Sequence, residues 1–287
     1  MTHKKNKKAF LARNVWFILF AFLFVFALLM VVRCYVKRWN DDNKLKSQQE
    51  TLAEIKEVSE ETESATDSVS SDEEQEVIPV ILPEYQDLYE QNQDLIGWLE
   101  IEGTNIDYPV MQTPEDEVYY LNRDFYKNEN INGCLIMDTD SNVGIGDREH
   151  AYENGSIPSS NLIIHGHTMQ SGEMFGNLNL YKDEAYGTEH SIIYFDSLYE
   201  HRQYELIAVF YSQVYYVDQD VFKYYKFFQA DTQAEFDDWY DNIKNLSLYD
   251  TGVTAQFGDE FITLSCCAYH VEDGRFVVVG KRISALD

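Results

Sequence analysis

The sequence predicts a mainly antiparallel β domain, a sandwich or a barrel, which follows a membrane anchor. Short β-branched or aromatic segments alternate with turn residues through the second half of the chain, and one amphipathic helix interrupts them late. An uncharged apolar run lies near the N-terminus. With 45% hydrophobic and 15% aromatic residues among 287, the chain can build a sizeable core.

Residues 15–32 form the candidate anchor, because these 18 residues carry no charge. As a helix they extend over about 27 Å, close to the thickness of the hydrocarbon layer. The alternative is a cleaved signal peptide, but the apolar run is long for one. A signal peptide would also be followed by a cleavage site of small residues, whereas a basic segment begins here at Arg33. Arg33 also fits poorly before a lipidated Cys34. The sequence therefore predicts an uncleaved anchor after a basic tail, residues 1–14.

The orientation of this anchor is not decided by charge. Five basic residues precede the apolar run and five follow it, so the positive-inside rule favours neither direction. Lys4, Lys5, Lys7, Lys8 and Arg13 lie before it, and Arg33, Lys37, Arg38, Lys44 and Lys46 lie after it.

Charge is distributed unevenly along the chain. Residues 1–46 hold 10 Lys/Arg and 2 Asp/Glu, a net of +8, and the remaining 12 Lys/Arg and 48 Asp/Glu give −36. A net charge of −28 argues against a nucleic-acid binder. Residues 47–78 are rich in Glu, Ser, Thr and Asp, so residues 33–82 are expected to form an acidic, largely disordered spacer, with at most a short helix at 45–58.

The globular domain is expected over residues 83–287. Leu88, Leu95, Ile96 and Trp98 have roughly helical spacing, which predicts a first helix that stops near Gly97. A second helix is predicted at 232–246, where apolar side chains recur at i, i+3, i+4 and i+7. Strands are predicted within 104–111, 133–138, 161–167, 191–196, 204–212, 260–267 and 275–283.

Two adjacent cysteines end the predicted strand 260–267. With a period of two, Cys266 shares a face with Ile262 and Leu264, which predicts a small core residue. Cys267 shares the more polar face with Ser265. If one of the pair is reactive, strand geometry favours Cys267. Four cysteines in the whole chain exclude a disulfide scaffold.

A seven-residue loop joins the cysteine strand to the strand that begins at Arg275. An antiparallel hairpin closed by this loop places Cys267 and Arg275 opposite each other or nearly so, with Cβ atoms ~5 Å apart. A neighbouring cation favours the nucleophilic thiolate, and an arginine can also stabilise an oxyanion. The alternative is a structural arginine that pairs with Glu272 or Asp273.

A nucleophilic cysteine also needs a group that carries protons, and histidine is the usual one. His165 and His167 end an apolar strand, and Gly166 between them permits a close backbone approach. Two structural histidines are one alternative, and a zinc site with Cys266 or Cys267 is another. The spacing matches no closed zinc pattern, so no metal and no other cofactor is expected.

The motifs together resemble the sortase family, and class B sortases in particular. TLSCC resembles the end of the family's cysteine strand, with Cys267 at the nucleophile position and Cys266 where the family usually has threonine. IIHGHT resembles its glycine–histidine segment, with His167 at the active position, and Arg275 matches the family's arginine. The class B likeness rests on DLIGWLEIEGTNIDYPVMQ, YYLNRDF, the pair Met174–Phe175 and the late helix, and it covers residues 84–287.

This resemblance implies a closed eight-stranded β-barrel with a helix before it and a helix inserted before the cysteine strand. It implies a cysteine transpeptidase that cleaves a C-terminal sorting signal after Thr and joins the surface protein to an amine of the cell wall. Cys267 would be the nucleophile, His167 the proton carrier and Arg275 the oxyanion or substrate-orienting group. Ser265 would either hydrogen-bond the substrate or have a structural role alone. The family also implies a Gram-positive cell membrane, with the N-terminus inside and the domain outside.

Two other functions remain open from the sequence. A pilus-polymerising sortase would use a pilin lysine, but such enzymes often carry a lid and a second membrane span, and neither is apparent in this sequence. A membrane-tethered binding module with a degenerate site would not need Cys267, His167 and Arg275 together.

Overall fold

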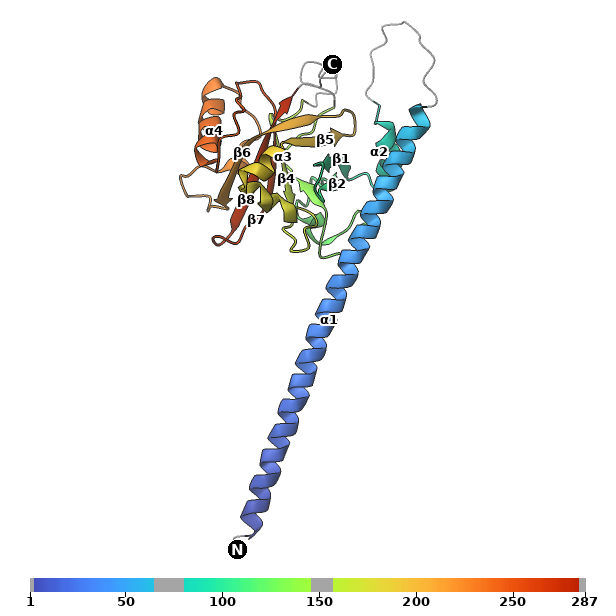
Figure 1. Ribbon diagram of the computed structural model, residues 1–287, viewed down its shortest axis with the longest axis vertical. Helices are drawn as coiled ribbons and strands as arrows, with labels where there is room; N and C mark the ends of the chain where they lie inside the picture. Colours follow the sequence, from blue (N-terminus) through green and yellow to red (C-terminus); the bar gives the residue numbers. More distant parts are fainter. Residues whose placement is uncertain (1–2, 65–79, 146–156, 284–287) are drawn as a thin grey trace. The chain divides into compact units, whose positions relative to one another are not determined.

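The computed structural model describes residues 3–64, 80–145 and 157–283, and it describes no side chains for residues 3–14, 18 and 59–64. The chain divides into two compact units, residues 1–47 and residues 48–287. The first unit is helical. The second contains an eight-stranded barrel with the helices that cover it (Figure 1).

Helix α1 extends from His3 to Ser64. It contains an apolar segment that is long enough to cross a membrane, and its side chains between 15 and 32 are exposed where they are described. The helix continues through residues 33–64, so the first part of the predicted spacer is not disordered. The rest of that spacer, residues 65–79, lies outside the described residues.

The last part of α1 belongs to the barrel unit and lies N-terminal to the domain boundary predicted at residue 83. Leu52 is only 2% exposed and packs in a cluster with Tyr85, Leu88 and Trp98, and Ile55 packs against the same cluster. Leu52 and Ile55 are three residues apart and therefore lie on one helix face. The composition of residues 47–78 did not indicate this packing, because acidic and hydroxyl residues greatly outnumber the few apolar ones there.

We expect Leu52→Ala to destabilise the barrel unit by about 2–5 kcal/mol, since it deletes a buried aliphatic side chain without weakening the helix. Denaturant unfolding of the full chain, followed by tryptophan fluorescence, measures this change. Val58→Ala on the same helix is the control, because Val58 is 64% exposed and should cost little. Equal losses in the two variants would contradict the packing of this segment.

Helix α2, Pro83–Gln91, is shorter than predicted, and Leu95–Glu100 forms strand β1. Leu95 and Trp98 are buried, as the apolar spacing suggested, but in a strand that pairs with β2, Asp107–Met111, and with β5, Ile192–Ser197. Gly97 is not a helix stop. A Cβ atom there would lie 2.3 Å from the carbonyl oxygen of Asp196 in β5, so glycine permits the close pairing of the two strands.

The eight strands close in the order β1-β2-β3-β4-β7-β8-β6-β5, which confirms the eight-stranded barrel that the resemblance implied. Six of the neighbouring pairs are antiparallel, and the pairs β2–β3 and β4–β7 are parallel. The remaining strands are β2 Asp107–Met111, β3 Leu135–Met137, β4 Asn161–Gly166, β5 Ile192–Ser197, β6 Gln203–Gln213, β7 Phe261–Cys267 and β8 Gly274–Ile283.

Short helices connect these strands, and one longer helix covers the outer surface of the barrel. Helix α4, Gln233–Leu246, confirms the helix predicted at 232–246 and begins at a capping box formed by Thr232 and Glu235. Its Phe236 and Trp239 pack against Phe261 of β7. The short helices are η1 Tyr119–Asn122, η2 Gly176–Lys182, α3 Glu184–Glu189 and η3 Tyr224–Lys226.

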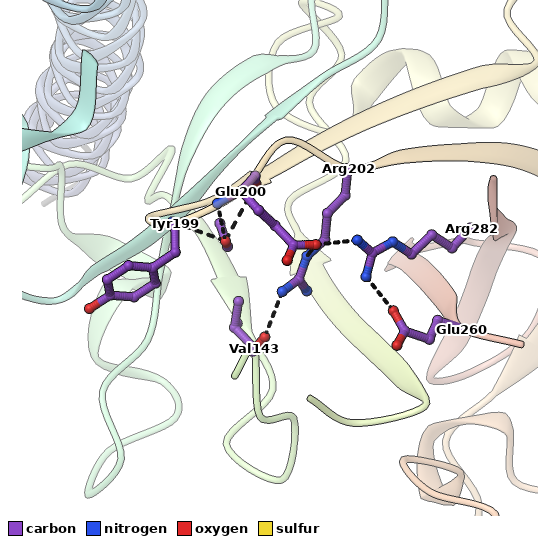
Figure 2. A network of polar contacts seen from close by, with 7 residues as sticks. Val143, Tyr199, Glu200, Arg202, Glu260 and Arg282 are labelled. Carbon is purple, nitrogen blue, oxygen red and sulfur yellow. Dashed lines mark hydrogen bonds and ion pairs between the residues drawn. The ribbon is translucent and has the colours of Figure 1, made fainter. Parts of the chain in front are cut away.

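A network of charged side chains joins the β5–β6 turn to β8 (Figure 2). The side chain of Arg202 is 1% exposed and donates to Glu200 and to the carbonyl oxygen of Val143, both at 2.9 Å. Arg282 of β8 bonds to Glu200 and to Glu260, which lies just before β7. Each charge thus has an opposite partner, as burial requires. The network holds the beginning of β6 against the strands that carry the site.

Candidate functional site

The parallel pairing of β4 with β7 brings two distant parts of the chain to one end of the barrel. His165 is paired with Ser265, and Gly166 with Cys266. Parallel strands point their carboxyl ends in the same direction, so His167, which follows β4 directly, and Cys267, which ends β7, lie at the same rim. Figure 1 shows β4, β7 and β8 within the barrel.

The two adjacent cysteines have different surroundings, as the strand period predicted. Cys266 is 2% exposed, and burial raises the pKa of its thiol to about 12, so it stays protonated and unreactive near neutral pH. Cys267 is partly exposed. Thr168 fixes the backbone at this position, because its hydroxyl donates to the carbonyl oxygen of Cys267 at 2.6 Å.

Cys267 lies directly opposite Arg275 in the β7–β8 hairpin, which confirms the predicted register. The guanidinium group of Arg275 donates to the carbonyl oxygens of Asp273 and Gly274, at 3.2 and 3.0 Å. Among the described residues it forms no ion pair with the carboxylates of Glu272 or Asp273, contrary to the structural alternative. Backbone carbonyl oxygens of its own turn therefore hold the guanidinium group.

The two histidines are held by different partners. His165 Nε2 lies 3.1 Å from Asp138 Oδ2. Burial would raise the pKa of Asp138, but hydrogen bonds from His165 and from the amide of Asp140 lower it overall, so the Asp138 carboxylate is held by His165. His167 Nε2 lies 2.8 Å from the carbonyl oxygen of Leu121. Since a carbonyl oxygen can only accept, Nε2 donates this hydrogen bond, which orients the His167 ring.

The cluster around His165 differs from the zinc site considered in the sequence. Ligand atoms of Glu117, Asp138 and His165 lie within 4.8 Å of one another. Neither His167 nor a cysteine belongs to this cluster, and the Cys266 side chain is buried.

A groove of about 520 Å³ contains all three predicted catalytic side chains, His167, Cys267 and Arg275. Ser265 also lines it, but Ser265 is 1% exposed, and its hydroxyl lies 2.7 Å from that of Tyr224 in η3. The other lining residues are Glu117, Val118, Leu121, Ile136, Asp138, Asp140, His165, Gly166, Val214, Tyr224, Tyr225, Lys226 and Cys266.

Sequence reasoning missed Tyr224, Leu121 and Thr168. The aromatic run that contains Tyr224 was the only signal for the first, because this run lies between a strand and a helix and is too apolar for an ordinary loop. Leu121 acts through its backbone carbonyl, which no sequence pattern marks. Thr168 acts only once β4 and β7 are paired.

Comparison with known proteins places this fold and groove in one family, although no family model matches the sequence. Sortase B of Listeria monocytogenes is 31% identical over 205 residues, which cover 70% of this chain and 74% of that protein. Sortase B of Staphylococcus aureus is 28% identical over 207 residues, 71% of this chain and 76% of that protein. A solved S. aureus sortase B–substrate complex superimposes with a TM-score of 0.66 and 22% identity over 86% of this chain and 99% of that one.

The barrel and its groove are thus those of a sortase-type cysteine transpeptidase. The chain belongs to the class B sortases.

Proposed function

We propose that Cys267 is the nucleophile, His167 the proton carrier and Arg275 the group that stabilises the oxyanion. The observation that carries this proposal is the strand register. It pairs Cys267 with Arg275, and the parallel pairing of β4 with β7 puts His167 at the same rim of the barrel. All three side chains line one groove, large enough for several residues of an extended peptide.

In the first half-reaction the Cys267 thiolate attacks the carbonyl carbon of Thr in a sorting signal, and a carbon–sulfur bond forms. The carbonyl electrons move to oxygen, where Arg275 offers a positive charge. When the tetrahedral intermediate collapses, the carbon–nitrogen bond breaks and His167 gives a proton to the departing amine. The product is a thioester on Cys267 and a free C-terminal tail.

In the second half-reaction an amine of the cell-wall precursor or peptidoglycan attacks the thioester. It loses a proton to His167, a new carbon–nitrogen bond forms, and the carbon–sulfur bond breaks. The Cys267 thiolate and the protonated His167 are thereby restored. The partners are surface proteins that carry a C-terminal sorting signal and a peptide amine of the wall.

The membrane places the enzyme where both substrates occur. We infer that residues 15–32 cross the membrane once and that residues 1–14 lie in the cytoplasm. The barrel unit then faces the cell wall. The length and composition of the apolar part of α1 support the span, and the family's cell-surface chemistry supports the orientation.

The test uses the full chain in detergent micelles with a pool of fluorescence-quenched peptides. The peptides vary at the three positions before Thr and at the position after it. Mass spectrometry of the quenched reaction should detect a peptide joined to Cys267 as a thioester, and a methanethiosulfonate reagent that modifies Cys267 should stop cleavage. Cleavage that continues after complete modification of Cys267 would contradict the proposal.

Ser265 is proposed as a residue of the substrate-binding wall. Ser265→Ala leaves the Tyr224 hydroxyl without its partner and should cost about 1–3 kcal/mol of stability, whereas adding Tyr224→Phe should recover most of that loss. Tyr224 lines the groove too, so if Ser265 binds the peptide, KM in the stable double variant stays above that of Tyr224→Phe alone. A KM in the double variant equal to that of Tyr224→Phe would leave Ser265 with a structural role alone.

A further inference from the structure

The loop that follows β4 has an unusual backbone held by several contacts. An isolated bridge pairs Thr168 with Met174, and the amide of Phe175 donates to the carbonyl oxygen of His167 at 3.0 Å. Met174 has φ of 52°, a left-handed conformation that non-glycine residues rarely adopt. Such a conformation persists only where its surroundings impose it. The loop therefore folds back on itself directly beside His167.

One buried hydroxyl group holds this turn in place. The hydroxyl of Tyr108 in β2 donates to Glu173 Oε2 at 2.8 Å and accepts from the amide of Met174 at 3.1 Å. Tyr108 and Glu173 are 3% and 4% exposed. Burial raises the pKa of Tyr108, so the hydroxyl keeps the proton that it donates to Glu173.

The other end of the same loop is tied to the nucleophile strand. Thr168 donates its hydroxyl proton to the carbonyl oxygen of Cys267, as described above, and it is paired with Met174 across the loop. Contacts thus lead from Tyr108 through Met174 and Thr168 to Cys267, and His167 lies within the segment they enclose. Neither Tyr108 nor Glu173 is among the described residues that line the groove, so neither is placed to touch a peptide.

We propose that Tyr108 and Glu173 are positioning residues that hold the loop of His167 in register with Cys267. They act through the backbone of Met174 and through the Thr168 hydroxyl. The proposal rests on the catalytic roles given above to His167 and Cys267, and it goes beyond them because it assigns a role to two buried residues that are not among the described residues lining the groove.

The experiment compares Tyr108→Phe with Tyr85→Phe in the full chain in detergent micelles. Tyr85 is the matched control, since it is fully buried and its hydroxyl also donates to a carboxylate, Asp196, at 2.6 Å. Hydrogen exchange of the amides of residues 168–175 is measured by mass spectrometry. Steady-state cleavage of the best peptide from the pool gives kcat and KM separately.

Tyr108→Phe is expected to speed exchange in residues 168–175 about tenfold or more, because the turn loses its anchor. It should lower kcat by roughly 10- to 100-fold with KM nearly unchanged, since small displacements of a reacting group have such effects. Tyr85→Phe should leave both quantities near those of the wild-type enzyme. Thr168→Val should lower kcat, and Thr168→Ser, which keeps the hydroxyl, should restore most of it.

Three results would overturn the positioning role. They are unchanged exchange in Tyr108→Phe, faster exchange with unchanged kcat, and equal losses of kcat in Tyr108→Phe and Tyr85→Phe. Failure of the proposed function has a different signature, namely cleavage that survives in Cys267→Ala or a wild-type enzyme that cleaves no peptide of the pool. In that case the effect of Tyr108 and Glu173 on catalysis fails too. The exchange data still decide whether Tyr108 holds the loop.

Discussion

Cys267→Ala should reduce peptide cleavage by about 10³-fold or more, because its thiol forms the acyl intermediate and the other described thiol that lines the groove, that of Cys266, is buried. The adjacent Cys266 should behave differently. Its side chain lies inside the barrel and its thiol stays protonated, so Cys266→Ala and Cys266→Thr should keep substantial activity. Cleavage rates of the three purified variants, with circular dichroism as a check of folding, measure both effects.

The paired design makes this result decisive. Both substitutions remove a thiol from the same strand at adjacent positions, so a general disturbance of β7 would affect them alike. An essential Cys266 beside a dispensable Cys267 would mean that the proposed nucleophile is wrong, whatever the fold. Mass spectrometry adds a direct readout, since the acylated peptide should contain Cys267 in the wild-type enzyme and in both Cys266 variants.

His167→Ala should lower turnover by about 10²–10⁴-fold with the fold intact, because an amine departs slowly unless it is protonated. His165→Ala should have a far smaller effect on turnover. The side chain of His165 is held by Asp138, and residues two apart along a strand are ~6.6 Å apart, so both cannot occupy the same position at the scissile bond. Cleavage of the same peptide by both variants measures the difference.

Stability measurements separate catalysis from folding in this pair. His165→Ala removes the hydrogen-bond partner that lowers the pKa of Asp138, so it should weaken the fold more than His167→Ala does. Comparable losses of turnover in the two variants would remove the distinction between them. Such a result would restore a shared role for the histidines, including a bound metal.

Much of the catalytic geometry could be predicted from local patterns. The period of two in residues 260–267 assigned Cys266 to the interior, and the seven-residue loop set Cys267 opposite Arg275. Both predictions depend only on strand pleat and hairpin register, which neighbouring residues determine. The recurrence of apolar side chains at i, i+3, i+4 and i+7 predicted α4 in the same way.

The errors arose where distant contacts override local spacing. Residues 95–100 have an apolar pattern that fits a helix, yet they pair with β2 and β5, and no local rule reveals these partners. Leu52 looked like part of a solvated spacer because its packing partners lie more than 30 residues away. The hydroxyl contacts of Thr168 and Tyr224 likewise require the finished barrel.

The parallel pairing of β4 with β7 also has a consequence for how activity arises during folding. It joins residues 100 positions apart, such as His165 and Ser265, and the chain between them must supply β5, β6 and α4 first. Contacts of such long range carry a large loop-closure cost and form slowly. A chain that has folded only as far as β6 has its histidine loop but no nucleophile. The groove that His167 and Cys267 line therefore assembles only once β7 has paired with β4, so the chemistry proposed for these two residues begins late in folding.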